Sequence, residues 1–174
     1  MKKILLPAIR IFRRLRNRFW SQIFRTQCRK CGPHIGVSTF CRISADADVE
    51  VDDFFHSNGL KVLGGGELRV GKQFQSGHGC TIMLGSHDFD NGECIPYGKR
   101  NTRKQVIIGD FVWMGTNSSI VGNITVGNGA IIGYGAVVVK DVPDYAIVGG
   151  NPAKIIKYRH IEHYNSLLAQ EKFN

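Results

Sequence analysis

Side chains that could transfer protons gather in one short stretch of this 174-residue sequence, Ser86-His-Asp-Phe-Asp90. Histidine suits general acid–base chemistry because its unperturbed pKa lies near neutral pH. His87 is therefore the first candidate for a catalytic residue, and Asp88, Asp90 or a backbone carbonyl could orient its ring. Alternatively, His87 could be a solvated loop histidine without a catalytic role. His78, which lies in a more regular part of the sequence, is a rival candidate.

Two other groups of residues have chemical potential. Tyr97 is followed by a basic cluster that could bind a nucleotide-sugar diphosphate or an acidic glycan, or could simply be solvated. The cluster comprises Lys99, Arg100, Arg103 and Lys104. The five cysteines are odd in number and irregularly spaced, which favours a reducing compartment over a disulfide framework. Cys28 and Cys31 have zinc or redox spacing, but a zinc site needs about four ligands and no second such pair occurs, so a structural or incidental role is expected.

The elements that would position these residues are predicted by a repeat of six. From Ile108 to Pro143 every sixth residue is aliphatic, and glycine often follows it. This period does not fit an amphipathic helix, but it fits a short strand and turn repeated around a solenoid. The first residue of each repeat should point inward and stack on its counterpart one coil away. These first residues are Ile108, Met114, Ile120, Val126, Ile132 and Val138, and small or aliphatic fifth residues are expected at the corners.

A weaker form of the repeat begins near Ile35, and its phase shifts at Gly64-Gly65-Gly66. About five coils of three repeats are expected in all. Between residues 86 and 106 the repeat is absent, so this stretch should leave the coil as an excursion loop that carries His87.

The first 27 residues contain eight bases and no acid, whereas the remainder is nearly neutral. Their apolar residues recur at spacings of three and four, which predicts a basic amphipathic helix starting near Pro7. The apolar run is too short for a transmembrane span, and no signal-peptide cleavage pattern follows it. The helix could pack on the solenoid or on a neighbouring subunit, or lie on an anionic membrane surface. A nucleic-acid partner is not expected, because no recognition motif accompanies the charge.

The sequence thus divides into a basic helical segment (1–30), a solenoid domain (31–158) with its excursion loop (86–106), and a C-terminal helical tail (159–174). Beyond Pro152 the repeat stops, and residues 155–172 are predicted to form a short helix that closes the open end of the solenoid. The predicted fold class is an all-β solenoid with one helix at each end.

Two motifs resemble those of the hexapeptide-repeat acyltransferases, which include galactoside, maltose, serine and xenobiotic acetyltransferases. The motifs are Asp110-Phe-Val-Trp-Met-Gly115 and Lys140-Asp-Val-Pro-Asp-Tyr-Ala-Ile-Val-Gly-Gly-Asn-Pro-Ala-Lys154, and the resemblance covers residues 70–158. It implies a left-handed parallel β-helix; the hand comes from the resemblance alone, because parallel crossovers are generally right-handed. It also implies a homotrimer with active sites between subunits. A cytoplasmic protein is expected, and residues 1–27 would allow peripheral contact with the inner face of the cell membrane.

The resemblance implies roles for individual residues. His87 would be the general base, and the backbone N–H of Thr116 would stabilise the oxyanion. Acetyl-CoA would be the co-substrate, with no metal required, and its candidate contacts are Trp113, Gly115, Gly133, Tyr134, Lys140, Lys154 and Lys157. Tyr134 departs from the small residue that the family often has there. Asp90, Tyr97, Lys99 and Arg100 are candidate contacts for the acceptor.

The expected function is acetyl-CoA-dependent O-acetylation of a sugar hydroxyl in a surface polysaccharide or its precursor, because the length and motifs of the loop resemble the sugar-modifying members. An amino-sugar N-acetyltransferase would use the same site. A non-catalytic β-helix scaffold is the alternative of another class. A zinc enzyme of the carbonic-anhydrase type would need a third histidine beside His78 and His87.

Overall fold

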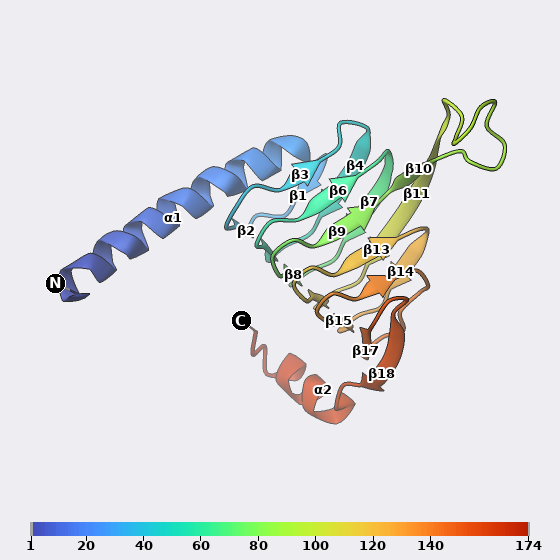
Figure 1. The fold of residues 1–174 in the computed structure, drawn as a ribbon. Helices are drawn as coiled ribbons and strands as arrows, with labels where there is room; N and C mark the ends of the chain where they lie inside the picture. Colours follow the sequence, from blue (N-terminus) through green and yellow to red (C-terminus); the bar gives the residue numbers. More distant parts are fainter. Residues whose placement is uncertain (1, 174) are drawn as a thin grey trace.

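The computed structural model describes residues 2–173, with side chains for residue 7 and residues 9–173. Short parallel strands wind into a solenoid of five complete coils and part of a sixth (Figure 1). A long helix, α1 (Lys2–Gln27), precedes the coils, and a short one, α2 (Ile161–Ala169), follows them. The predicted basic amphipathic helix includes Lys2, Lys3 and Leu5, whose side chains lie outside the described part. Residues 1 and 174 also lie outside it.

Each coil contributes one strand to each of three sheets, here called A, B and C. Sheet A contains β1 (Lys30–Cys31), β4 (Ala47–Val51), β7 (Gly66–Val70), β11 (Asn101–Ile108) and β14 (Ile124–Val126), with β10 (Gly85–His87) added antiparallel to β11. Sheet B contains β2 (Ile35–Val37), β5 (Phe55–Ser57), β8 (Gln75–Ser76), β12 (Trp113–Met114), β15 (Ile131–Ile132), β17 (Ala146–Gly149) and β18 (Lys154–Tyr158). Sheet C contains β3 (Arg42–Ile43), β6 (Lys61–Leu63), β9 (Thr81–Met83), β13 (Ser119–Val121) and β16 (Val137–Val138).

The repeat of six is confirmed by the strand register. Ile108 pairs with Val126, Met114 with Ile132, and Ile120 with Val138, one coil of three repeats apart. All six of these first-position residues are buried, as are the fifth-position residues. The core is therefore the predicted aliphatic column, which no single repeat could bury alone.

The first coils are slightly longer than the later ones. Val51 pairs with Val70 nineteen positions later, whereas Ile108 pairs with Val126 eighteen positions later. Between the inward positions Val62 and Val70 the interval is eight residues instead of six, at the predicted Gly64-Gly65-Gly66 phase shift, whereas the interval from Ser57 to Val62 is five. Gly66 is required there, because a Cβ atom on it would lie within 2.5 Å of the Leu84 carbonyl oxygen.

The corner between sheets A and B uses the left-handed backbone conformation in successive coils. Phe54, Gln73 and Phe111 have φ angles of 56°, 56° and 58°. Gly129 occupies the same corner in the next coil with φ of 66°. Since bulky residues rarely adopt positive φ, the stacked coils must impose this conformation at the corner.

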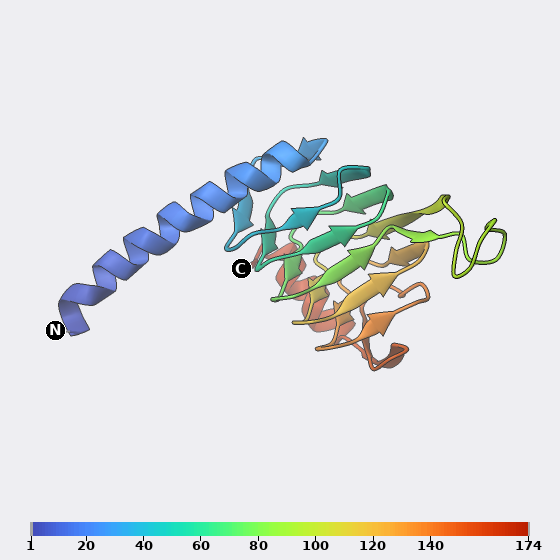
Figure 2. The same cartoon turned by 45° about the horizontal axis from the view of Figure 1, so that its top comes forward.

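The last part of α1 covers the first coil. Phe24 is buried and stacks on Phe55 with ring centroids 4.9 Å apart, and Phe55 stacks in turn on Phe74. The Ser21 hydroxyl accepts a hydrogen bond from the Val37 N–H at 3.0 Å. The earlier part of α1 projects beyond the coils (Figures 1 and 2). The helix begins at Lys2, so the predicted start near Pro7 was too late.

The C-terminal prediction was wrong in two respects. Residues 155–158 belong to β18, which pairs antiparallel with the otherwise open edge of β17, and the helix is confined to Ile161–Ala169. Pairing satisfies backbone groups that the end of the solenoid would leave unpaired. In addition, α2 packs against the side of the coils rather than across their end, because Tyr164 contacts Phe111 and Tyr145 of the sheet A–B corner.

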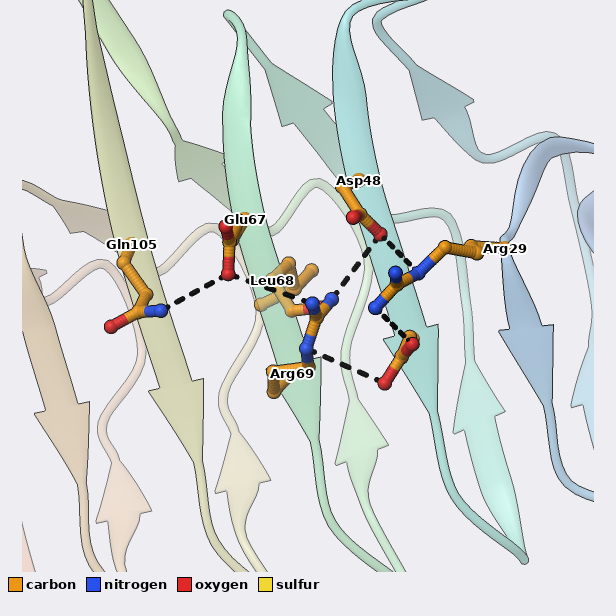
Figure 3. A network of polar contacts seen from close by, with 7 residues as sticks. Arg29, Asp48, Glu67, Leu68, Arg69 and Gln105 are labelled. Atoms are coloured by element: carbon orange, nitrogen blue, oxygen red, sulfur yellow. Dashed lines mark hydrogen bonds and ion pairs between the residues drawn. The ribbon is translucent and has the colours of Figure 1, made fainter.

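A network of charges crosses sheet A on its outer surface (Figure 3). Arg69 of β7 contacts Asp48 and Glu50 of β4 at 3.2 and 3.4 Å, and Arg29 reaches the same two carboxylates. The network continues through Glu67 and Gln105 to β11. It links successive coils, so it supports the stacking without entering the core.

Candidate active site

His87 is held by a β-hairpin that leaves the solenoid. It is the last residue of β10 and lies opposite Asn101 of β11 in an antiparallel pair. The hydroxyl of Thr102 donates to the Ser86 carbonyl at 3.0 Å and accepts from the Ser86 N–H at 3.2 Å. The first and last parts of the predicted excursion are therefore strands, which hold His87 in a defined position at the base of the loop.

The ring of His87 is exposed and stacks on Tyr97. The two ring centroids are 3.9 Å apart, and the planes differ by 7°. Gly92 and Gly98 close the loop beyond them: a Cβ atom on Gly92 would lie 2.7 Å from the Cα of Gly98. The loop thus has a close backbone crossing that brings Tyr97 back to His87.

The predicted carboxylate partners do not contact His87 in this chain. The carboxylate of Asp88 accepts from the Asn91 N–H at 2.9 Å, so it stabilises the loop instead. Asp90 is exposed, and among the described residues no hydrogen bond reaches the His87 ring. Lys99 and Arg100 are exposed at the end of the loop, where the Arg100 carbonyl accepts from the Asp88 N–H.

Thr116 lies at the corner between sheets B and C, where no side chain of the described residues caps its backbone N–H. At the preceding corner, the equivalent N–H of Asp110 donates to the Asn128 side chain at 2.8 Å, and the Asn128 N–H donates to Asp144. The residue eighteen positions after Thr116 is Tyr134, whose side chain cannot cap in this way. Within the described part of the chain, the Thr116 N–H has no hydrogen-bond acceptor.

The structure does not bring His87 and Thr116 together within one chain. Thr116 precedes β13, whereas the hairpin with His87 follows β9, and these two parallel strands are neighbours in sheet C. The two residues therefore lie at opposite ends of the sheet C strands. Figure 1 shows the hairpin extending away from β8 and β15.

Two of the candidate CoA contacts, on sheet B and at its corner with sheet C, are exposed aromatic side chains. Trp113 of β12 is 52% exposed and Tyr134 is 76% exposed, and the Asn117 amide donates weakly to the Tyr134 hydroxyl at 3.5 Å. Gly115 and Gly133 allow the coils to stack beneath them. A Cβ atom on Gly115 would lie 2.8 Å from the Tyr134 backbone nitrogen.

The three candidate lysines fall into two places. Lys154 and Lys157 are on β18, and a register shift between their partners, Gly149 and Ile147, puts both side chains on the same outward face. Without the shift, residues three apart would point to opposite faces. Lys140 is exposed beyond β16 of sheet C, so the structure does not group it with the other two.

His78 is exposed at the sheet B–C corner, where its carbonyl accepts from the Asn117 N–H at 2.8 Å. It belongs to the coil below Thr116, and not to the hairpin of His87. Among residues 2–173, no group of three or more histidine, cysteine or acidic side chains is placed to hold a metal ion.

Sequence reasoning missed a cavity between α2 and sheet B. It has a volume of about 460 Å³, and its lining includes Phe111, Trp113, Arg159, Tyr164 and Phe173. Arg159 donates to the Gly129 carbonyl and lies 5.5 Å from the centre of the Tyr164 ring. Burial lowers the pKa of Arg159 and raises the pKa of Tyr164. The aromatic residues of the tail were the available signal, but their partners are set by the fold.

Comparison with known proteins finds acetyltransferases both among similar sequences and among solved structures. No family model matches the chain. Over 67 residues, 38% of the chain and 32% of the relative, it is 51% identical to chloramphenicol acetyltransferase of Agrobacterium fabrum strain C58. Over 65% of its length it is 29% identical to the putative lipopolysaccharide biosynthesis O-acetyl transferase WbbJ of Escherichia coli K12, covering 59% of that protein. The chain therefore spans about a third of the first of these relatives and less than two thirds of the second.

Two solved structures superpose on most of the chain. A maltose O-acetyltransferase from Clostridium difficile 630 has a TM-score of 0.68 with 23% identity, covering 88% of each chain. A galactoside acetyltransferase in complex with coenzyme A also has a TM-score of 0.68, with 19% identity, covering 82% of this chain and 71% of its own. At these identities the superpositions establish the fold alone.

These observations define a left-handed parallel β-helix, since solenoids of opposite hand would not superpose over this length. The stacked repeats of six and the segments that match acetyltransferase sequences indicate which group of β-helix proteins the chain resembles. The chain has the fold of the hexapeptide-repeat acetyltransferases and resembles acetyltransferases in sequence over part of its length.

Proposed function

We propose that the protein transfers an acetyl group from acetyl-CoA to a hydroxyl of a sugar in a surface polysaccharide or its precursor. The observation that carries the proposal is the display of an exposed histidine on a hairpin that interrupts the repeat, in a chain that also has an uncapped backbone N–H at the sheet B–C corner. A scaffold would not need His87 displayed on a hairpin. The sugar acceptor is supported by the names of the relatives and structural neighbours, among them WbbJ and a maltose O-acetyltransferase.

Each side chain has a defined task in the proposed reaction. His87 accepts the proton of the acceptor hydroxyl as that oxygen attacks the thioester carbonyl. The Thr116 N–H donates to the carbonyl oxygen as negative charge develops on it. His87 then returns the proton to the departing CoA sulfur, so that ester and free thiol are formed. Lys154 and Lys157 offer positive charge to the phosphates of CoA, and Trp113 and Tyr134 offer apolar surface to its pantetheine arm.

The proposed assembly is a trimer with an active site between each pair of subunits. His87 and Thr116 of one chain lie at opposite ends of the sheet C strands, so one chain cannot present both to the same carbonyl. A neighbouring subunit can supply the missing partner in a cyclic assembly. Acetyl-CoA and the five free cysteines both fit a cytoplasmic setting.

Calorimetry with acetyl-CoA, run on the wild type, His87→Ala and His78→Ala, tests the proposal. All three proteins should bind acetyl-CoA. Thiol release on a panel of sugars should fall about 100- to 10,000-fold in His87→Ala and persist in His78→Ala. Absence of acetyl-CoA binding in the wild type would leave the non-catalytic scaffold as the function. Turnover of amino sugars but not of hydroxyl acceptors would replace O-acetylation by N-acetylation.

A further inference from the structure

The projecting part of α1 carries an apolar stripe that the described residues leave exposed. Phe12 is 66% exposed and Phe19 is 58% exposed, and Ile9, Ile11 and Leu15 are exposed as well. At about 100° per residue, Phe12 and Phe19 lie within about 20° of each other around the helix, with Leu15 beside them. A continuous stripe of this kind on a monomeric surface indicates a binding site.

The stripe faces away from the coils. Ser21 and Phe24, which dock α1 on the first coil, lie about 200° and 140° around the helix from Phe19. The same helix therefore binds the solenoid with one face and presents its apolar stripe on the opposite one. None of the described helices has the length and apolar character needed to cross a membrane.

The charge on this helix identifies its partner. Arg10, Arg13, Arg14 and Arg18 are exposed on the polar half of the helix, and the first 27 residues contain no acid. Arg16 is exposed too, only about 40° from Phe12, within the apolar half. Arg25 is not counted among the arginines available to a partner, because its guanidinium donates to the Gly32 carbonyl at 3.0 Å.

These features favour a lipid surface over a second copy of the chain as the partner of the apolar stripe. A bundle of identical helices would bring their arginines together and would bury Arg16 in the apolar contact. At a bilayer surface, an arginine beside the apolar stripe can extend its guanidinium to the headgroups while its methylene groups remain in apolar surroundings. Anionic headgroups also match the remaining four arginines.

We propose that residues 9–19 of α1 lie in the interface of an anionic phospholipid bilayer, with Phe12, Leu15 and Phe19 inserted among the acyl chains. The buried Phe24 keeps the helix fixed to the first coil, so the solenoid would be held on the aqueous side. The segment is about 16 Å long, which is a suitable length for an in-plane interfacial helix. The proposal does not depend on the acetyl-transfer reaction.

Vesicle flotation of the full chain tests it. The wild type should bind vesicles of phosphatidylcholine mixed with phosphatidylglycerol, bind pure phosphatidylcholine at least about tenfold less, and dissociate as salt is raised. The double variant Phe12→Ser/Phe19→Ser and the double variant Arg13→Gln/Arg14→Gln should each reduce binding at least about tenfold. Ile156→Ser and Arg42→Gln, at exposed positions on the solenoid, are the matched controls and should bind as the wild type does.

Circular dichroism should show that all four variants keep the fold, because none of these side chains is in the core. Equal binding to neutral and anionic vesicles, or no vesicle binding by the wild type, would overturn the proposal. It would also be overturned if Phe12→Ser/Phe19→Ser dissociated an oligomer while vesicle binding was unchanged, since the stripe would then be a contact between copies.

Discussion

The imidazole of His87 lies parallel to the phenol ring of Tyr97, with centroids 3.9 Å apart and an angle of 7° between the planes. The two residues come from β10 and from the loop beyond it, so the stack ties the loop to the hairpin. Among the described residues no carboxylate forms a hydrogen bond to His87, so we expect the stacked Tyr97 ring to orient the imidazole.

Replacing Tyr97 should therefore change catalysis through ring orientation. Tyr97→Ala should lower kcat about two- to tenfold, which corresponds to the roughly 0.5–1.5 kcal/mol of an aromatic pair. Tyr97→Phe keeps the ring and should retain most of the activity. Steady-state kinetics should show little change in KM for acetyl-CoA in either variant. An equal loss in both variants would assign the effect to the phenol hydroxyl and contradict a role for stacking.

The aliphatic column should dominate the stability of the solenoid. Ile120 is fully buried and stacks between Ile82 and Val138 of adjacent coils. Ile120→Ala should lower the free energy of unfolding by about 2–5 kcal/mol, because it leaves a cavity that the rigid coils cannot close. Its neighbour Val121 points outward and is 40% exposed, so Val121→Ala should have an effect of about 1 kcal/mol or less. Denaturant unfolding of both variants measures the difference.

The sequence predicted the column because a period of six fixes which residues point inward whatever surrounds them. It could not predict the Arg29, Asp48 and Arg69 network of Figure 3, since those contacts depend on the nineteen- and twenty-residue spacing of the early coils. The β18 strand was missed for a related reason. All five of its residues are exposed, so it has no apolar pattern, and its formation depends on the open edge of β17.

Some features of the candidate site could be predicted from the sequence, and others could not. The break in the repeat was sufficient to identify the excursion and His87, because the loop is an interruption of a regular pattern. The stack on Tyr97 depends on the close approach of Gly92 and Gly98, which no repeating sequence pattern indicates. The free N–H of Thr116 becomes visible only when its corner is compared with that of Asp110 and Asn128.

Cys28 and Cys31 should differ in reactivity. The Cys28 thiol donates a hydrogen bond to Cys31, which lowers the pKa of Cys31 despite its partial burial, with a further contribution from Arg25. The pKa of Cys28 is raised by the same pairing and by burial. Since a thiolate is the reactive form, alkylation of Cys31 should begin at a pH below the ordinary thiol pKa.

The measurement is the rate of iodoacetamide labelling of the Cys31 peptide as a function of pH. Cys28→Ala removes the donor and should move the midpoint to higher pH, whereas Cys28→Ser retains a hydroxyl donor and should move it less. If Cys28→Ala left the midpoint unchanged, the hydrogen bond would not be the cause of the lowered pKa.

Position 134 should control whether the Thr116 N–H is available. At the neighbouring corner, the side chain of Asn128 accepts from the Asp110 N–H at 2.8 Å. Tyr134→Asn places the same acceptor one coil beyond Thr116, so it should occupy that N–H and lower kcat about 100- to 1,000-fold. Tyr134→Ala offers no acceptor and should keep kcat within about tenfold of the wild type. Thr116→Ala retains the backbone N–H and should also remain active.

Calorimetry should show that Tyr134→Asn still binds acetyl-CoA, which would separate the loss of oxyanion stabilisation from a loss of binding. Mixed trimers then test the arrangement between subunits. His87→Ala and Tyr134→Asn chains are each inactive alone, but a site formed by His87 of one and Thr116 of the other is intact. Random mixing in equal amounts should restore about a quarter of the wild-type sites. No recovery after exchange of subunits would contradict an active site shared between chains.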